Sequence, residues 1–88
     1  MNTQLSMSRR ERIIAYSLAI EALKQEQRIE EWITANPTAV VWTLPDTKGR
    51  RVCTIVRDGK VVAKSVGADE VDARAQAFSV VFTAEEAR

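Results

Sequence analysis

Few side chains in this sequence are of the types that carry out catalysis or bind metals. The 88 residues include one cysteine, Cys53, and no histidine. Zinc sites built from Cys and His, and the Ser-His-Asp and Cys-His catalytic arrangements, therefore cannot be assembled from this chain. No glycine-rich phosphate loop is present, and no motif activates the Cys53 thiol. We therefore expect no enzymatic activity, no metal or other cofactor, and no small-molecule substrate.

Basic residues are the other chemically distinctive group, and they are concentrated in the middle of the chain. Residues 38–66 contain six basic and two acidic residues, whereas residues 67–88 contain two basic and five acidic ones, and the whole chain has a net charge of +1. Basic side chains attract acidic protein surfaces and phosphates. One set, named here the strand cations, would contact an acidic protein partner: Arg51, Arg57, Lys60 and Lys64. A second, overlapping set, the loop cations, would contact nucleic acid: Lys48, Arg50 and Arg51.

A hairpin and a following helix must position these basic residues. Residues 51–57 and 60–66 are rich in β-branched residues and are separated by Asp58-Gly59, a loop typical of hairpins whose two central residues need positive φ. Residues 38–44 predict a preceding strand, so three strands form an antiparallel meander. Gly67 ends the last strand, and Asp69 can cap a helix that continues to about Glu86.

The two-residue loop also predicts which side chains share a face of the sheet. It pairs Arg57 with Lys60 and Ile55 with Val62. The face expected to pack on the helices carries Thr54, Val56, Val61 and Ala63. The opposite face is expected to be exposed, and it carries Cys53, Ile55, Val62 and the strand cations. Trp42, on the first strand, is expected in the core.

The N-terminal part of the chain predicts a long helix with two apolar faces. Ser8-Arg9-Arg10-Glu11 has the form of a capping box, and Asn36-Pro37 stops the helix near Ala35. One face carries Ile14, Leu18, Ala22, Ile29, Trp32 and Ile33. The roughly opposite face is apolar in its first half only and is named here the N-terminal stripe: Ile13, Tyr16, Ile20 and Leu23.

A helix on one side of a sheet needs a single apolar face, so the N-terminal stripe requires a second partner. In one interpretation the helix breaks near Lys24–Gln27, and each half buries its own side. In the other, the stripe binds a second copy of the chain or another protein. The sequence leaves both interpretations open.

The chain as a whole predicts one α+β domain over residues 8–88, in the order α-β-β-β-α, after a flexible N-terminus at residues 1–7. No apolar run is long enough to cross a membrane, and no secretory signal is visible. We therefore expect a cytoplasmic protein that does not bind membranes.

The junction from residue 67 to residue 78, Gly-Ala-Asp-Glu-Val-Asp-Ala-Arg-Ala-Gln-Ala-Phe, resembles the last strand-to-helix junction of double-stranded-RNA-binding domains. The expected order of elements is the same as well. The resemblance implies the fold of that family but not its RNA binding. Asp69, Glu70 and Asp72 stand where the family has phosphate-binding lysines, and carboxylates repel phosphates.

The hairpin Arg57-Asp58-Gly59-Lys60-Val61-Val62, followed by an alanine-rich helix, also resembles small phage proteins such as anti-CRISPR proteins and other inhibitors of host defence. That resemblance implies a protein that occupies a partner's surface. We therefore expect a protein-binding module, with inhibition of a partner and formation of a homodimer as its candidate roles. The alternative is a nucleic-acid-binding domain that uses the loop cations together with the basic residues of the strands.

Overall fold

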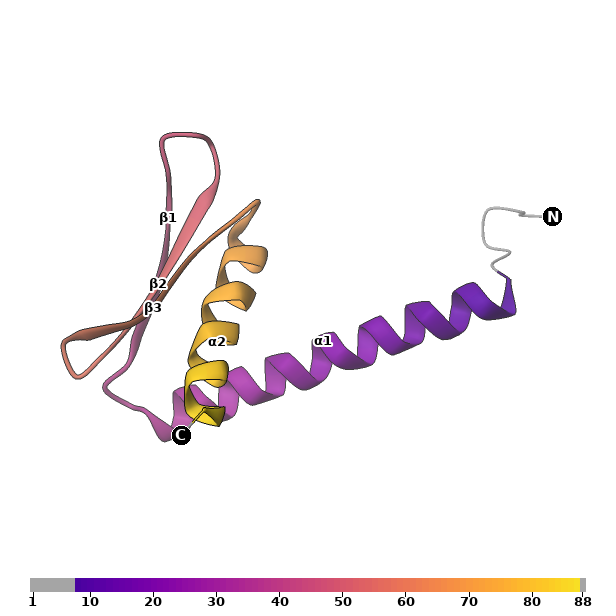
Figure 1. The fold of residues 1–88 in the computed structure, drawn as a ribbon, viewed down its shortest axis with the longest axis horizontal. Helices are drawn as coiled ribbons and strands as arrows, with labels where there is room; N and C mark the ends of the chain where they lie inside the picture. Colours follow the sequence, from indigo (N-terminus) through magenta and orange to yellow (C-terminus); the bar gives the residue numbers. More distant parts are fainter. Residues whose placement is uncertain (1–7, 88) are drawn as a thin grey trace. The chain divides into compact units, whose positions relative to one another are not determined.

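The computed structural model describes residues 8–87, so the predicted flexible N-terminus at residues 1–7 lies outside the described residues. Five elements follow one another along the chain (Figure 1). They are helix α1 (Arg9–Ala35), strands β1 (Val40–Pro45), β2 (Arg51–Arg57) and β3 (Lys60–Gly67), and helix α2 (Glu70–Glu86). The strands form one antiparallel sheet in the order β1-β2-β3. The predicted α+β class and the α-β-β-β-α order are confirmed.

The chain divides into two compact units within α1. The described part of the first unit is residues 8–31, which contain most of α1. The second unit begins at Trp32 and contains the last turn of α1, the sheet and α2.

Helix α1 begins with the predicted cap and is unbroken. The hydroxyl oxygen of Ser8 accepts a hydrogen bond from the backbone N–H of Glu11 at 3.1 Å. The helix then continues over 27 residues to Ala35, and the side-chain amide of Asn36 donates to the carbonyl of Trp32 at 2.8 Å just beyond its end. The interpretation that the helix breaks near Lys24–Gln27 is therefore wrong.

The hairpin turn forms as predicted, but the strands pair differently beyond it. Asp58 and Gly59 have φ values of 54° and 76°, as the two-residue turn requires. Arg57 pairs with Lys60, and Val56 pairs with Val61. The register then shifts, so that Ile55 pairs with Ala63 and Val62 is the extra residue of a β-bulge.

The bulge reverses the alternation of side chains along the rest of β3, because side chains point to opposite faces with a period of two. Ala63 therefore lies on the same face as Cys53 and Ile55, and these three residues are 0–4% exposed. Lys64, paired with Thr54, lies on the other face. The predicted assignment of the faces is wrong, since the Cys53 and Ile55 face is the buried one and Val61 on the opposite face is 62% exposed.

Helix α2 covers the buried face of the sheet, contacting β2 and β3 most extensively (Figure 1). Its buried side chains are Ala73, Ala77, Phe78, Val81 and Phe82. The ring of Phe78 makes an edge-on contact with Trp32 at a centroid distance of 5.6 Å, and it lies 6.0 Å from the ring of Phe82. The core of the second unit is thus an aromatic cluster set against small and β-branched strand residues.

The predicted cap of α2 is also confirmed. The carboxylate of Asp69 accepts the backbone N–H of Asp72 at 2.8 Å, and the Asp72 carboxylate accepts the N–H of Ala68 at 2.9 Å. The bond from Ala68, together with one from the side-chain amide of Gln76, lowers the pKa of Asp72 below its ordinary value. Acidic residues also suit the positive end of the helix dipole.

Gly67 is required at the junction of β3 and α2 because the two elements approach closely there. A Cβ atom at this position would lie 2.3 Å from the backbone nitrogen of Ala73 and 2.8 Å from the carbonyl carbon of Asp72. Both neighbouring atoms belong to the backbone of α2, so a side chain at residue 67 would push the helix off the sheet.

We expect Gly67→Ala to lower the free energy of unfolding by about 3 kcal/mol or more, since the clash is with backbone atoms. Gly49→Ala is the matched control: Gly49 has φ +75° and no atom within 4 Å of the added carbon, so only a backbone penalty of about 1–2 kcal/mol applies. Chemical denaturation of both variants measures the difference. Equal losses would show that α2 does not constrain Gly67.

Candidate functional site

The N-terminal stripe is exposed along the first half of α1. The side chains of Ile13, Tyr16, Ile20 and Leu23 are each between 50% and 67% exposed. They recur at intervals of three, four and three residues, which places them on one face of a helix. Four large apolar side chains in a row on an exposed helix face are typical of a surface that binds another protein.

The other predicted apolar face of α1 is divided into an exposed part and a buried part. Ile14 and Leu18 are more than half exposed, whereas Ile29 and Trp32 are almost fully buried. Ile33, in the last turn, is 38% exposed. Only the C-terminal end of this predicted apolar face is therefore buried.

Charge is unevenly distributed along α1. Residues 9–12 contain three arginines and one glutamate, which gives a net charge of +2. Residues 21–31 contain four glutamates, one lysine and one arginine, which gives −2. Lys24 lies 4.0 Å from Glu21, and both side chains are well exposed, so this pair adds little stability. The two ends of the N-terminal stripe therefore lie in regions of opposite charge.

The face of the sheet opposite α2 is a second exposed apolar surface. Trp42, which the sequence placed in the core, lies on this face and is 38% exposed. Leu44 and Val61 are more than half exposed. A depression of about 440 Å³ on this face is lined by Trp42, Leu44, Pro45, Val52, Thr54, Val61 and Lys64. Sequence reasoning missed this surface, although Val40, Trp42 and Leu44 alternate in β1 as residues of one face do.

The strand cations do not form one surface. The bulge places Lys64 on the open face, in the depression just described, whereas Arg57 is on the face covered by α2. Lys60 lies beside Arg57 at the hairpin end, and Arg51 is at the far end of β2, paired with Gly67. These four residues would therefore meet a partner from different sides of the sheet.

Arg57 makes intramolecular contacts that connect three elements. Its guanidinium donates to the side-chain oxygen of Asn36 at 3.2 Å and lies 5.7 Å from the centre of the Trp32 ring. It is also 3.9 Å from the carboxylate of Glu85, which accepts the indole N–H of Trp32 at 2.8 Å. The contacts of Arg57 thus join the ends of α1, β2 and α2.

The loop cations lie between β1 and β2, and one of them is held by an ion pair. The carboxylate of Asp46 accepts the backbone N–H groups of Lys48 and Arg50, each at 2.8 Å. The guanidinium of Arg50 also binds this carboxylate, at 2.9 Å. Desolvation raises the pKa of Asp46, but these hydrogen bonds and the Arg50 charge outweigh it, so the pKa is lowered from 3.8. A phosphate would compete with Asp46 for Arg50.

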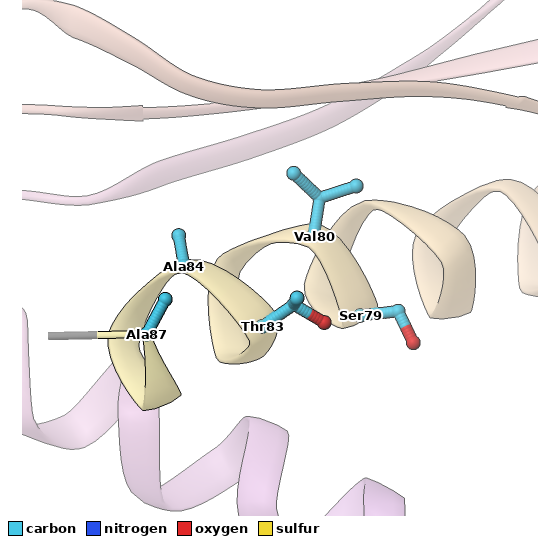
Figure 2. A pocket seen from close by; sticks show the side chains of 5 residues that line it. All are labelled: Ser79, Val80, Thr83, Ala84 and Ala87. Carbon is cyan, nitrogen blue, oxygen red and sulfur yellow. The ribbon is translucent and has the colours of Figure 1, made fainter.

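A depression of about 450 Å³ lies on α2. Figure 2 shows the side chains that line it on successive turns of the helix: Ser79, Val80, Thr83, Ala84 and Ala87. Its polar side-chain groups are two hydroxyls, and its lining contains no ionisable side chain, so it offers no group for acid–base chemistry.

Cys53 lies in the core, where it is 0% exposed. Burial raises the pKa of its thiol, which keeps the thiol protonated and unreactive in the folded state. Within residues 8–87, no group of three or more Cys, Asp or Glu side chains is placed to hold a metal ion. No helix in the described part of the chain has the length and apolarity needed to cross a membrane.

We expect Arg57→Ala to lower the free energy of unfolding by about 1–2 kcal/mol, because it removes a partly buried hydrogen bond and the stacking on Trp32. Lys60→Ala is the control, since Lys60 is paired with Arg57 but is exposed, and we expect a change within about 0.5 kcal/mol. Urea denaturation measures both changes. Similar effects of the two substitutions would contradict a structural role for Arg57.

Asp46→Asn tests whether the Asp46 carboxylate stabilises the loop between β1 and β2, through the pH dependence of the free energy of unfolding. A carboxylate with a lowered pKa stabilises the folded state above its ordinary pKa of 3.8, and this contribution disappears as pH falls through the lowered value. We therefore expect the variant to be less stable than the parent at pH 6, with the difference in the free energy of unfolding decreasing as the pH falls below 3.8. Glu21→Gln, on exposed α1, controls for the loss of one charge. A difference that is independent of pH would contradict this assignment.

Comparisons with protein-family models, with curated proteins and with solved structures found no match to this chain. The resemblances to double-stranded-RNA-binding domains and to small phage inhibitors therefore remain predictions from sequence.

Proposed function

We propose that this chain is a non-catalytic protein-binding module that self-associates through the N-terminal stripe of α1. The observation that supports this most strongly is the exposure of Ile13, Tyr16, Ile20 and Leu23 on a helix that continues unbroken through them. Burying one such side chain fully contributes about 1.5–3 kcal/mol, so a surface that buries four from each copy has a substantial driving force.

The spacing of the stripe is that of a short coiled coil. Residues 13, 16, 20 and 23 occupy the alternating three- and four-residue intervals at which two helices interdigitate their apolar side chains. A second copy of α1 could therefore pack its own apolar side chains between those of the N-terminal stripe. The opposite charges of residues 9–12 and 21–31 make the surface electrically complementary to another copy of itself.

The alternatives have less support. Nucleic-acid binding by the loop cations would have to displace Arg50 from the carboxylate of Asp46, at the cost of a charge-assisted contact. A role as a phage-type inhibitor in the cytoplasm is compatible with a self-associating module, and it rests on the sequence resemblance alone.

Light scattering of the purified protein tests self-association. We expect a solution mass of twice the chain mass of 9.9 kDa at concentrations of tens of micromolar. The double change Ile20→Glu and Leu23→Glu places charges in the stripe, so we expect a monomer with unchanged helix content by circular dichroism. A monomeric parent protein at these concentrations would refute the proposal.

The same helix supplies a matched control. Ile14→Glu with Leu18→Glu also replaces two exposed apolar residues of α1, but on a different face. We expect this variant to keep the dimeric mass. Loss of the dimer in both double variants, with folding intact, would show that added negative charge and not the N-terminal stripe is responsible.

A further inference from the structure

We propose that two copies of α1 pair in antiparallel orientation, with Ile13 of one copy opposite Leu23 of the other and Tyr16 opposite Ile20. This inference rests on the proposed self-association and specifies its geometry. It concerns a helix that is continuous from Arg9 to Ala35 and whose stripe side chains are at least half exposed.

The spacing of the stripe permits this arrangement because the series of intervals between its residues is symmetric along the helix. The intervals between residues 13, 16, 20 and 23 are three, four and three. Reversing one helix about the midpoint at residue 18 therefore superimposes the apolar positions of the two copies. All four side chains of each copy then lie in the interface. A parallel pair would instead place each residue beside its own copy, including Tyr16 beside Tyr16.

The charges along the helix favour the antiparallel pair. In that orientation residues 9–12, with net charge +2, lie beside the partner's residues 24–27, which contain Lys24 and Glu26 and form the middle of the region 21–31, whose net charge is −2. In a parallel pair each region would lie beside its own like-charged copy. Opposite charges at the two ends of the stripe thus select the direction of the second helix.

The charged residues that flank the stripe can be compared pair by pair in the antiparallel and the parallel arrangement. In an antiparallel coiled coil Arg12 lies beside Glu26 of the other copy, and the pair occurs twice by symmetry. The flanking contact between Arg10 and Lys24 is unfavourable and also occurs twice by symmetry, so it offsets the two Arg12–Glu26 contacts. A parallel pair has no compensating attraction, because it places Glu26 beside Glu31 of the other copy. The overall balance therefore favours the antiparallel orientation.

Disulfide cross-linking distinguishes the two orientations. Ten residues of helix separate positions 13 and 23, about 15 Å along the axis. A disulfide requires Cα atoms within about 7 Å. In an antiparallel dimer, oxidising a mixture of the Ile13→Cys and Leu23→Cys proteins should give a covalent dimer, whereas each variant oxidised alone should give none. Like-to-like cross-links from the separate variants, with none specific to the mixture, would overturn the antiparallel geometry.

The full-length chain supplies its own controls for this experiment. The parent protein tests the native thiol, and we expect no cross-link from it because Cys53 is fully buried. Leu18→Cys places a thiol on the same helix but off the stripe, and we expect no cross-link there either. Light scattering of each sample before oxidation separates the two hypotheses: a monomer refutes self-association, while a dimer with like-to-like cross-links refutes only the orientation.

Charge reversal gives a second measurement that does not depend on added cysteines. In the antiparallel pair Glu26→Arg loses two contacts with Arg12, so we expect the dimer dissociation constant to rise by about fivefold. Adding Arg12→Glu in the same chain should restore the parent value. In a parallel pair Glu26→Arg would relieve repulsion from Glu31 and tighten the dimer, which would overturn the proposal.

Discussion

The close packing of α2 on the inner face of the sheet is the constraint on which the second unit depends. Phe78 is fully buried, its ring and that of Trp32 form a T-shaped pair, and the strand residues Cys53 and Ile55 are fully buried as well. The contact requires the backbone of α2 to approach β3 so closely that residue 67 has no room for a Cβ atom. Arg57 takes part in the same packing. Its guanidinium lies over the Trp32 ring and donates a hydrogen bond to Asn36.

The β-bulge at Val62 determines what the protein presents on its open face. By adding one residue to β3, it brings Ala63 under α2, where a small side chain fits, and turns Lys64 outward. The strand cations are thereby divided between two faces, and an apolar surface that includes Trp42 and Leu44 is left exposed. The strand cations therefore do not form one continuous basic face that would attract an acidic partner.

The first half of α1 depends on a different kind of constraint. A helix whose large apolar residues remain exposed gains little stability from packing on its own chain. Self-association, as proposed above, would supply the burial that the residues around Ile13 and Leu23 lack. The division of charge along the same helix would give the proposed contact a direction, independent of the apolar spacing.

The sequence by itself determined the local features. Ser8 and Asp69 cap the two helices, Asn36-Pro37 ends the first helix, and Asp58-Gly59 makes the hairpin, because each of these signals acts within a few residues. These signals predicted the α-β-β-β-α order and the stripe of α1. Only the tertiary structure decided the faces: Cys53 and Ile55 are buried while Trp42 is exposed. The reason is that the bulge has no local signature, and the face that a strand buries depends on which side α2 covers, a contact between residues far apart in the chain.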